Sequence, residues 1–321
     1  MNLWHSNHKN AMISTSQPLT SADRIRIRQP GDASFALGPH VDGGSVERWE
    51  PNGYGRGGVY DKIFQGRWDE YDPWESTCRI PVVNDLYEGS GSCSMFRMFQ
   101  GWLGLSHTGP REGTLMVNPL LQLATAYFLL RPFFELKHQS ETLVAGNLTP
   151  DSLEADSWRL KSAAEMSTEL HGANPGNGQE LNDAFHPHLD LSTSMVHIPQ
   201  IRPGDFVVWH CDTIHAVDKV HNGKGDSSVM YIPVCPTTKA NADYMARQRD
   251  MFLSGEPAPD FPGGKGESEH IGRPGTEYVA EIGGDEGLRS MGLAKLETKE
   301  WEKSEGARKV VEKANRILGL A

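Results

Sequence analysis

The sequence RPGDFVVWHCDTIH, residues 202–215, combines a turn, a strand and two histidines in one short stretch. Its Pro-Gly pair is a strong turn signal, and the apolar run that ends at Trp209 has the length of a buried strand. His215 follows Asp205 by ten residues. The stretch therefore predicts a strand that starts from a turn and places a histidine just beyond its end.

Short strand signals separated by glycine and proline recur along the chain. Arg24–Arg28 alternates basic and apolar residues strictly, which is the period of a half-buried strand. Comparable runs are Ser94–Leu105, Gly113–Val117, Ser194–Ile198 and Ser228–Val234. Because few of these runs alternate with helical patterns, we expect a mainly β fold with flanking helices, built as an antiparallel barrel or jelly roll.

Helical patterns and a polar start flank this β region. Helices are expected at Leu120–Phe134, Ala240–Leu253 and Lys303–Leu318, with a short one around Ser157–Leu170. Residues 1–22 are polar and are expected to form a flexible leader. Residues 23–321 are expected to form one domain, with a helical extension from about residue 237. The aromatic-rich stretch Gly43–Thr77 indicates an ordered insertion, since large aromatic side chains are rarely left in solvent.

The composition narrows the function classes. The chain has 321 residues with 31 basic and 42 acidic side chains, a net charge of −11, which argues against binding nucleic acid or an anionic membrane through general electrostatics. No window supplies the roughly 20 apolar residues of a membrane helix, and the start lacks a secretory apolar core. The four cysteines are widely spaced and form no CxxC pair, which indicates a reducing compartment. We expect a cytoplasmic protein that acts on a small molecule.

Three His-x-Asp motifs are the candidates for metal ligation. Residues two apart on a strand point to the same face, so one imidazole and one carboxylate can meet at a single ion. With a further histidine, such a pair forms the 2-His-1-carboxylate triad of non-haem iron(II) sites. The motifs are His40/Asp42, His188/Asp190 and His210/Asp212. The first is favoured because it follows a strand and a turn, and because the two glycines after it would let a cofactor approach the backbone.

Residues 202–215 resemble the distal metal-ligand strand of the iron(II)/2-oxoglutarate dioxygenases, in particular the phytanoyl-CoA-hydroxylase-like branch. In that branch the distal histidine follows a Pro-Gly-Asp turn at the same interval. Residues 101–105 and 112–119 look like its tryptophan-bearing core strand and the hairpin after it. Three further stretches more closely resemble the YbiU-like family of unassigned function; they are residues 26–31, 38–49 and 255–262. The resemblance covers roughly residues 23–295.

The resemblance implies a double-stranded β-helix, a cupin-like jelly roll that brings its first and seventh strands side by side. It implies that His40, Asp42 and His215 ligate iron(II), and that Trp102 lines the pocket of the co-substrate 2-oxoglutarate. The activity implied is the iron(II)- and 2-oxoglutarate-dependent hydroxylation of a small molecule. His210 competes with His215 as the distal ligand, although packing or a hydrogen bond beside the metal is the stronger interpretation of His210.

One departure from the family pattern concerns the far carboxylate of 2-oxoglutarate. The related hydroxylases bind it with an arginine about eleven residues after the distal histidine, since a planar guanidinium suits a carboxylate. Here that position falls in Asp226–Ser228, which holds no arginine. Arg26 and Arg28 are expected to take its place, with Ser228 as a helper. Arg97 is a weaker candidate, and a solvated strand face is the competing interpretation of the alternating arginines.

The sequence is also compatible with two other functions. A cupin-like metal enzyme that does not use 2-oxoglutarate would keep His40, Asp42 and His215 and would need no arginine clamp. A binding scaffold that has lost catalysis would keep the barrel alone. YbiU-like proteins usually carry a longer segment before the first core strand, so this chain is expected to be shorter there. The sequence sets neither the substrate nor the oligomeric state.

Overall fold

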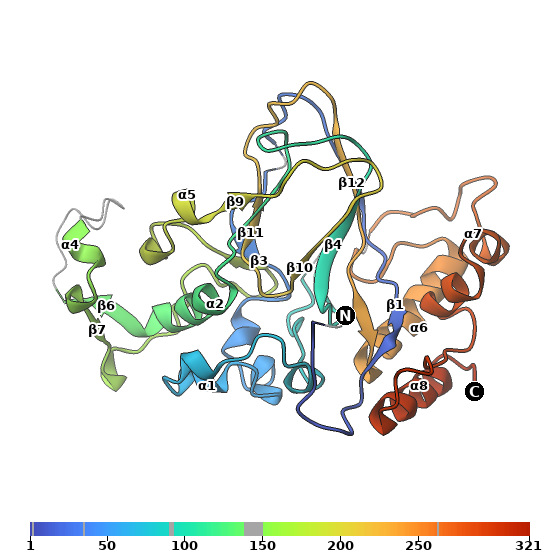
Figure 1. Ribbon diagram of the computed structural model, residues 1–321, viewed down its shortest axis with the longest axis horizontal. Helices are drawn as coiled ribbons and strands as arrows, with labels where there is room; N and C mark the ends of the chain where they lie inside the picture. The colour runs from blue at the N-terminus through green and yellow to red at the C-terminus, as the bar shows by residue number, and fades with distance from the viewer. Residues whose placement is uncertain (2, 35, 90–92, 138–149, 262) are drawn as a thin grey trace.

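The computed structural model describes residues 1, 3–34, 36–89, 93–137, 150–261 and 263–321. Two antiparallel sheets form its centre (Figure 1). The four-stranded sheet has the order β10 (Phe206–His210), β4 (Phe99–Gly104), β12 (Ser227–Tyr231), β2 (Ile25–Arg28). The five-stranded sheet has the order β8 (Gln179–Glu180), β3 (His40–Val41), β11 (His215–Val217), β5 (Leu115–Val117), β9 (Val196–His197).

The two sheets share a buried cluster of side chains. Trp102 of β4 and Trp209 of β10 pack in it with Leu115 of β5, so residues from both sheets meet there. The Trp209 Nε1 donates a hydrogen bond of 2.7 Å to the side chain of Gln100, the residue opposite it on the neighbouring strand β4. This bond holds the Trp209 indole in place. Because strand residues alternate between faces, every second residue of these strands points into the space between the sheets.

The alternation in β2 turns the arginines inward and the isoleucines toward solvent. Ile25 and Ile27 are 57% and 60% exposed, whereas Arg28 is buried and Arg26 is half-buried. The prediction of a half-buried strand is therefore confirmed, but the arginines are the residues that face inward. The competing interpretation of these arginines as a solvated face is wrong for Arg26 and Arg28.

The fold class is mixed α/β and not mainly β as expected, with about 29% of residues in helices and 18% in strands. The jelly roll is not confirmed, because no sheet closes on itself within the described part of the chain. The strands are short, and β3, β8 and β9 contain only two residues each. Such short strands leave about half of the chain in turns and irregular connections.

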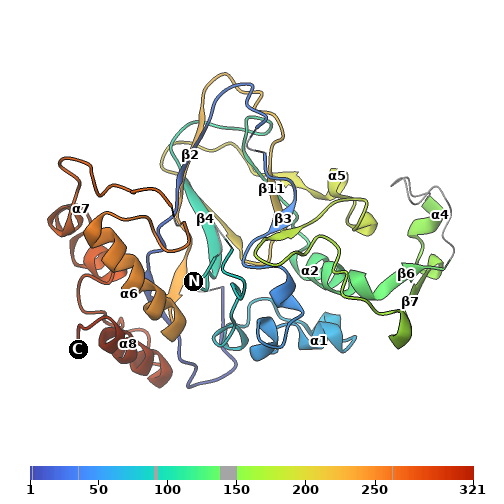
Figure 2. The same ribbon diagram turned by 180° about the vertical axis from the view of Figure 1, so that it is seen from behind.

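Helices lie on two sides of the sheets (Figures 1 and 2). One side holds α1 (Asp61–Phe64), α2 (Leu121–Leu130), α4 (Pro150–Leu153) and α5 (Leu191–Ser194), with the hairpin β6 (Phe134–Leu136) and β7 (Trp158–Leu160). The opposite side holds α6 (Lys239–Ser254), α7 (Thr276–Ser290) and α8 (Glu305–Ile317). The helices expected near both α6 and α8 are confirmed. The short helix expected around Ser157–Leu170 is wrong, because Trp158–Leu160 pairs with β6 instead.

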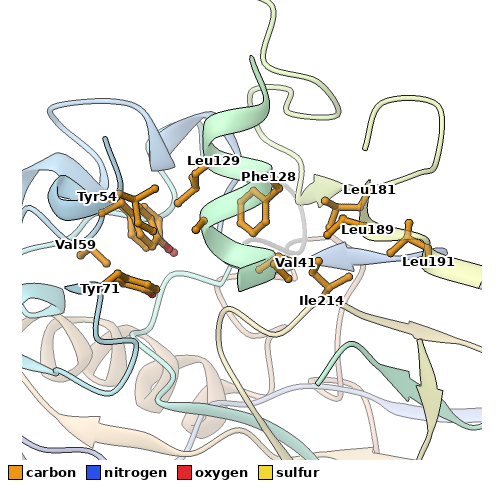
Figure 3. Close-up of a cluster of buried hydrophobic side chains, with 14 of the residues drawn as sticks. Val41, Tyr54, Val59, Tyr71, Phe128, Leu129, Leu181, Leu189, Leu191 and Ile214 are labelled. Atoms are coloured by element: carbon orange, nitrogen blue, oxygen red, sulfur yellow. The ribbon is translucent and has the colours of Figure 1, made fainter. Parts of the chain in front are cut away.

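A large apolar core lies behind the five-stranded sheet. It joins tyrosines of the aromatic insertion, Tyr54 and Tyr71, to Phe128 and Leu129 of α2 (Figure 3). Val41 of β3 belongs to the same cluster and is fully buried. The insertion is thus ordered, as expected, and the core anchors the face of β3 that lies opposite to His40.

The start of the chain is part of the fold, and the prediction of a flexible leader over residues 1–22 is wrong. Ser14–Leu19 forms β1, which pairs antiparallel with β13 (Cys235–Thr237). Trp4 is 7% exposed and stacks on His210 with 4.7 Å between ring centroids. A polar segment can still be ordered when a few of its residues bury a large apolar area, and composition alone does not reveal this.

We predict that Trp4→Ala lowers the free energy of unfolding by about 3 kcal/mol or more, because a buried indole is replaced by a cavity. Leu3→Ala is the matched control, since Leu3 is 69% exposed in the same segment. Urea unfolding followed by tryptophan fluorescence and circular dichroism measures both variants. Equal stability of Trp4→Ala and the parent protein would mean that the segment is a leader after all.

Candidate metal centre

His40, Asp42 and His215 meet at one point on the five-stranded sheet. Strands β3 and β11 are antiparallel neighbours, and His40 lies directly opposite His215. The two imidazole rings are 4.2 Å apart between centroids. Asp42 follows the end of β3, and its carboxylate lies 3.5 Å from the Nε2 atom of each histidine. One ligand atom from each residue lies within 4.8 Å of the other two.

Backbone hydrogen bonds set the ring orientation of both histidines. The Nδ1 of His40 lies 2.7 Å from the Gly38 carbonyl, and the Nδ1 of His215 lies 3.0 Å from the Thr213 carbonyl. A carbonyl can only accept, so Nδ1 carries a hydrogen in each ring, and both Nε2 atoms face Asp42. Metal-binding histidines are commonly held in this way. Two ligand atoms that bind one metal ion at right angles, each about 2.1 Å from it, are about 3 Å apart. The distance of 3.5 Å between the Asp42 carboxylate and each histidine Nε2 is close to this value.

The electrostatics favour the protonation states that a metal requires. Burial lowers the pKa of His40, and the neighbouring His215 adds to this effect. Burial opposes the ionisation of Asp42, yet the hydrogen bond with His215 and the electrostatic interactions with His40 and Arg97 hold the pKa of Asp42 well below its usual range. A neutral imidazole and an ionised carboxylate are the forms that bind a cation.

A cavity of about 100 Å³ lies beside the three ligands, between the two sheets. Arg26, Trp102 and Tyr231 contribute to its wall from the four-stranded sheet. The Arg26 Nη1 lies 3.5 Å from the Tyr231 hydroxyl, while its Nη2 is buried and has no hydrogen-bond partner among the described residues. Arg97 also lines the cavity, and its Nη2 lies 4.0 Å from the Asp42 carboxylate. The cavity therefore combines a group of possible metal ligands with guanidinium groups that can receive an anion.

The structure does not bring Arg28 and Ser228 to this cavity, contrary to expectation. The buried Arg28 guanidinium donates hydrogen bonds of 2.7 Å to the carbonyls of Asp32 and Asp218. Ser228 donates its hydroxyl to Asp226. It lies on the opposite face of β12 from the residue paired with Arg26, because strand residues alternate. Both side chains are already used in structural hydrogen bonds.

The other His-x-Asp motifs are hydrogen-bonded elsewhere. His210 Nε2 lies 2.8 Å from the Pro73 carbonyl, and its Nδ1 accepts from the Asp212 amide at 3.0 Å. His188 has Tyr127 and the Leu153 carbonyl at 3.0 Å from its two ring nitrogens. The nitrogens of both rings thus have hydrogen-bond partners, whereas the Nε2 of His215 faces the carboxylate of Asp42. His210 also forms a compact group with Cys211 and Asp212, but its ring is stacked on Trp4.

Some residues of the site were not found from the sequence. Asp260 and Phe261 line the cavity although they belong to the C-terminal extension, and Tyr231 lines it from β12. Tyr231 lies in the run Ser228–Val234 that the sequence predicts as a strand, and Asp260 and Phe261 lie in the stretch 255–262 that resembles the YbiU-like family. Neither signal showed that these residues reach the cavity, which Asp260 and Phe261 do through the loop after α6.

A family model described as Gig2-like matches residues 1–293. The chain belongs to the Gig2-like family. The uncharacterised protein YbiU of Escherichia coli K12 is 36% identical over 240 residues, which are 75% of this chain and 49% of that protein. The expected resemblance to YbiU-like proteins is therefore confirmed.

Solved structures of similar proteins extend this finding. The crystal structure of GlcNAc Inducible Gene 2 from Candida albicans has a TM-score of 0.81 and 35% identity, and the match covers 98% of this Gig2-like chain and 65% of that one. The "Putative Oxidoreductase" from Salmonella typhimurium LT2 has a TM-score of 0.73 and 32% identity, and the match covers 91% of this chain and 61% of that one. The chain thus spans about half of the YbiU protein and less than two thirds of these two chains. Among the described residues, no helix has the length and apolar character needed to cross a bilayer.

We predict that His215→Ala weakens the binding of cobalt(II), a spectroscopic substitute for iron(II), by more than about 100-fold, because loss of a direct ligand exceeds the 10- to 100-fold effect of outer partners. His210→Ala is the comparison, and it is expected to keep metal affinity within a few-fold while losing stability through its contact with Trp4. Isothermal titration calorimetry measures both affinities. Loss of binding in His210→Ala with retention in His215→Ala would reverse the ligand assignment.

Proposed function

We propose that this Gig2-like protein is an oxidoreductase that holds iron(II) on His40, Asp42 and His215 and uses 2-oxoglutarate to oxidise a small molecule. The observation that carries the proposal is the meeting of two imidazole Nε2 atoms and one carboxylate beside a cavity that also holds an unpartnered guanidinium nitrogen of Arg26.

The donor set fits iron(II). Two neutral imidazoles and one carboxylate on neighbouring strands match the facial triad of non-haem iron oxygenases, which leaves positions open for other ligands. When bound, iron(II) and 2-oxoglutarate would supply oxygen activation coupled to oxidative decarboxylation of the 2-oxoglutarate. The name of the Salmonella relative is in line with an oxidoreductase.

The residues of the chain have separate tasks in this proposal. The Nδ1–carbonyl hydrogen bonds keep both imidazole rings aimed at one point. Arg97 faces the Asp42 carboxylate at 4.0 Å and favours its ionised form. Trp102, which is 4% exposed, gives the cavity an apolar wall that limits access of water.

Arg26 is the residue proposed to bind the far carboxylate of 2-oxoglutarate. Its guanidinium enters the cavity from β2, and the buried Nη2 lacks the partner that such an atom normally has. A carboxylate would accept from both terminal nitrogens, because the guanidinium offers parallel N–H groups. Arg26 would thus replace the arginine that the related hydroxylases carry after the distal histidine.

We predict that Arg26→Gln reduces the affinity of the iron(II)-loaded protein for 2-oxoglutarate by roughly 10- to 100-fold, since hydrogen bonds to charged groups contribute about 1.5–3 kcal/mol. Arg67→Gln is the control, because Arg67 is half exposed and pairs with Glu70 on the surface. Anaerobic calorimetry gives the dissociation constants.

Undiminished binding by Arg26→Gln would place the carboxylate elsewhere in the cavity. Iron(II) binding without any 2-oxoglutarate binding in the parent protein would favour a metal enzyme of another kind. Absence of iron(II) binding would leave a binding scaffold.

A further inference from the structure

Asp212 lies at the centre of a buried charged cluster next to the candidate metal centre. Its carboxylate accepts hydrogen bonds from the hydroxyls of Tyr60 and Tyr71, each at 3.0 Å, and contacts the Arg79 guanidinium at 2.5 Å. The Nη2 of Arg48 lies 4.0 Å from the Oδ1 of Asp212, whereas Arg79 contacts its Oδ2. The side chains of Asp212, Arg48 and Arg79 are all at most 3% exposed. Burying such charges is costly, and replacing them with apolar residues often stabilises a protein.

Arg48 connects this cluster to the backbone of the ligand Asp42. Its Nη2 donates a hydrogen bond of 2.8 Å to the Asp42 carbonyl, and its Nη1 donates to the Gly44 carbonyl. Gly43 and Gly44 have φ values of +83° and +76°, in the left-handed region that favours glycine. Their conformation turns the backbone around the guanidinium, so the Gly-Gly pair supports this contact.

Asp212 connects the same cluster to the ligand His215. It belongs to the turn between β10 and β11, three residues before His215. The next residue, Thr213, supplies the carbonyl that lies 3.0 Å from the His215 Nδ1. Movement of Asp212 would therefore shift the carbonyl that orients the His215 imidazole.

Strand pairing holds the two histidine ligands but does not extend to Asp42. Strand β3 consists of His40 and Val41; it pairs with β11 through His40 opposite His215 and with β8 through both of its residues, and β11 also pairs with β5. Asp42 lies beyond the end of β3 and is not part of that pairing. Contacts from outside these strand pairs therefore act on the Asp42 segment.

We propose that Arg48 and Asp212 are positioning residues of the metal centre, which lock the Asp42 segment against the turn that carries His215. This inference rests on the proposed metal site. Neither side chain is among those that line the cavity, so both act through the ligands and not on the metal. Tyr54 and Tyr60 reinforce the link: Tyr54 donates to the Gly43 carbonyl at 2.9 Å, and its ring stacks on Tyr60.

The test compares cobalt(II) binding by the parent protein, Arg48→Met, Arg48→Lys and Arg249→Met. Arg249 is the matched control because its largely buried guanidinium also donates to two backbone carbonyls, those of Gly292 and Leu318, away from the metal centre. Calorimetry gives the affinity, the cobalt(II) visible spectrum reports the geometry, and thermal unfolding reports stability. Hydrogen exchange of the amides of residues 42–45 in the metal-free protein adds a readout that needs no metal.

We expect Arg48→Met to bind cobalt(II) about 10- to 100-fold more weakly, as for other partners of metal ligands, with a changed spectrum and faster exchange at residues 42–45. Arg249→Met should lose stability and keep parent-like affinity. Arg48→Lys keeps the charge that faces Asp212 but cannot bridge the carbonyls, so it should fold and still bind several-fold more weakly; it decides the outcome if Arg48→Met does not fold.

Arg48 variants that bind cobalt(II) no more weakly than Arg249→Met would overturn the proposal while leaving the metal site in place. A parent protein that binds no cobalt(II) would overturn the metal site itself, and the positioning role with it.

Discussion

The pairing of His40 with His215 is the interaction on which the site depends. It is the single point at which β3 and β11 are hydrogen-bonded neighbours, and it places two imidazoles on one face of the sheet. The alternation of strand residues then sends Val41 and Ala216 to the other face, where both belong to the large apolar core. Burial of these two residues therefore determines which way the histidines point, because a slip of one residue would turn the ligands into the core.

Polar groups that are expensive to bury gather around this pair. The Asp212 cluster lies behind the ligands, and Arg26 of β2 lies in front of them, across the cavity. Most of these groups have hydrogen-bond partners, and such networks favour one arrangement of a core more than they raise its stability. The Arg26 Nη2 is buried without a partner among the described residues, as are the Nε atoms of Arg48 and Arg79, but of these three arginines only Arg26 lines the cavity beside the ligands. We interpret this position as the mark of a ligand site.

The sequence predicted the parts of the site that depend on local spacing. The resemblance carried by the His-x-Asp motif and the Pro-Gly-Asp turn implied His40, Asp42 and His215 as the ligand set, and the structure brings these three side chains together. The alternation in β2 predicted a strand but not its sense, since a period of two shows that the faces differ and not which face is buried. Arg28 faces inward as its expected place at the cavity required, but its guanidinium binds backbone carbonyls instead.

Features that depend on distant contacts could not be predicted in this way. Trp4 is held by His210 and the aromatic residues near it, which lie far along the sequence, so its polar surroundings suggested a leader. Arg48 has no motif of its own, and its role follows from a Gly-Gly turn and a carboxylate about 160 residues away.

The most direct test of the proposed centre is an anaerobic titration of the purified protein with iron(II) and then 2-oxoglutarate, followed by visible absorption. We predict a weak metal-to-ligand charge-transfer band that needs both components and is lost in His40→Ala. Iron(II) binding with no such band would contradict the use of 2-oxoglutarate, and a band that persists in His40→Ala would contradict the ligand assignment.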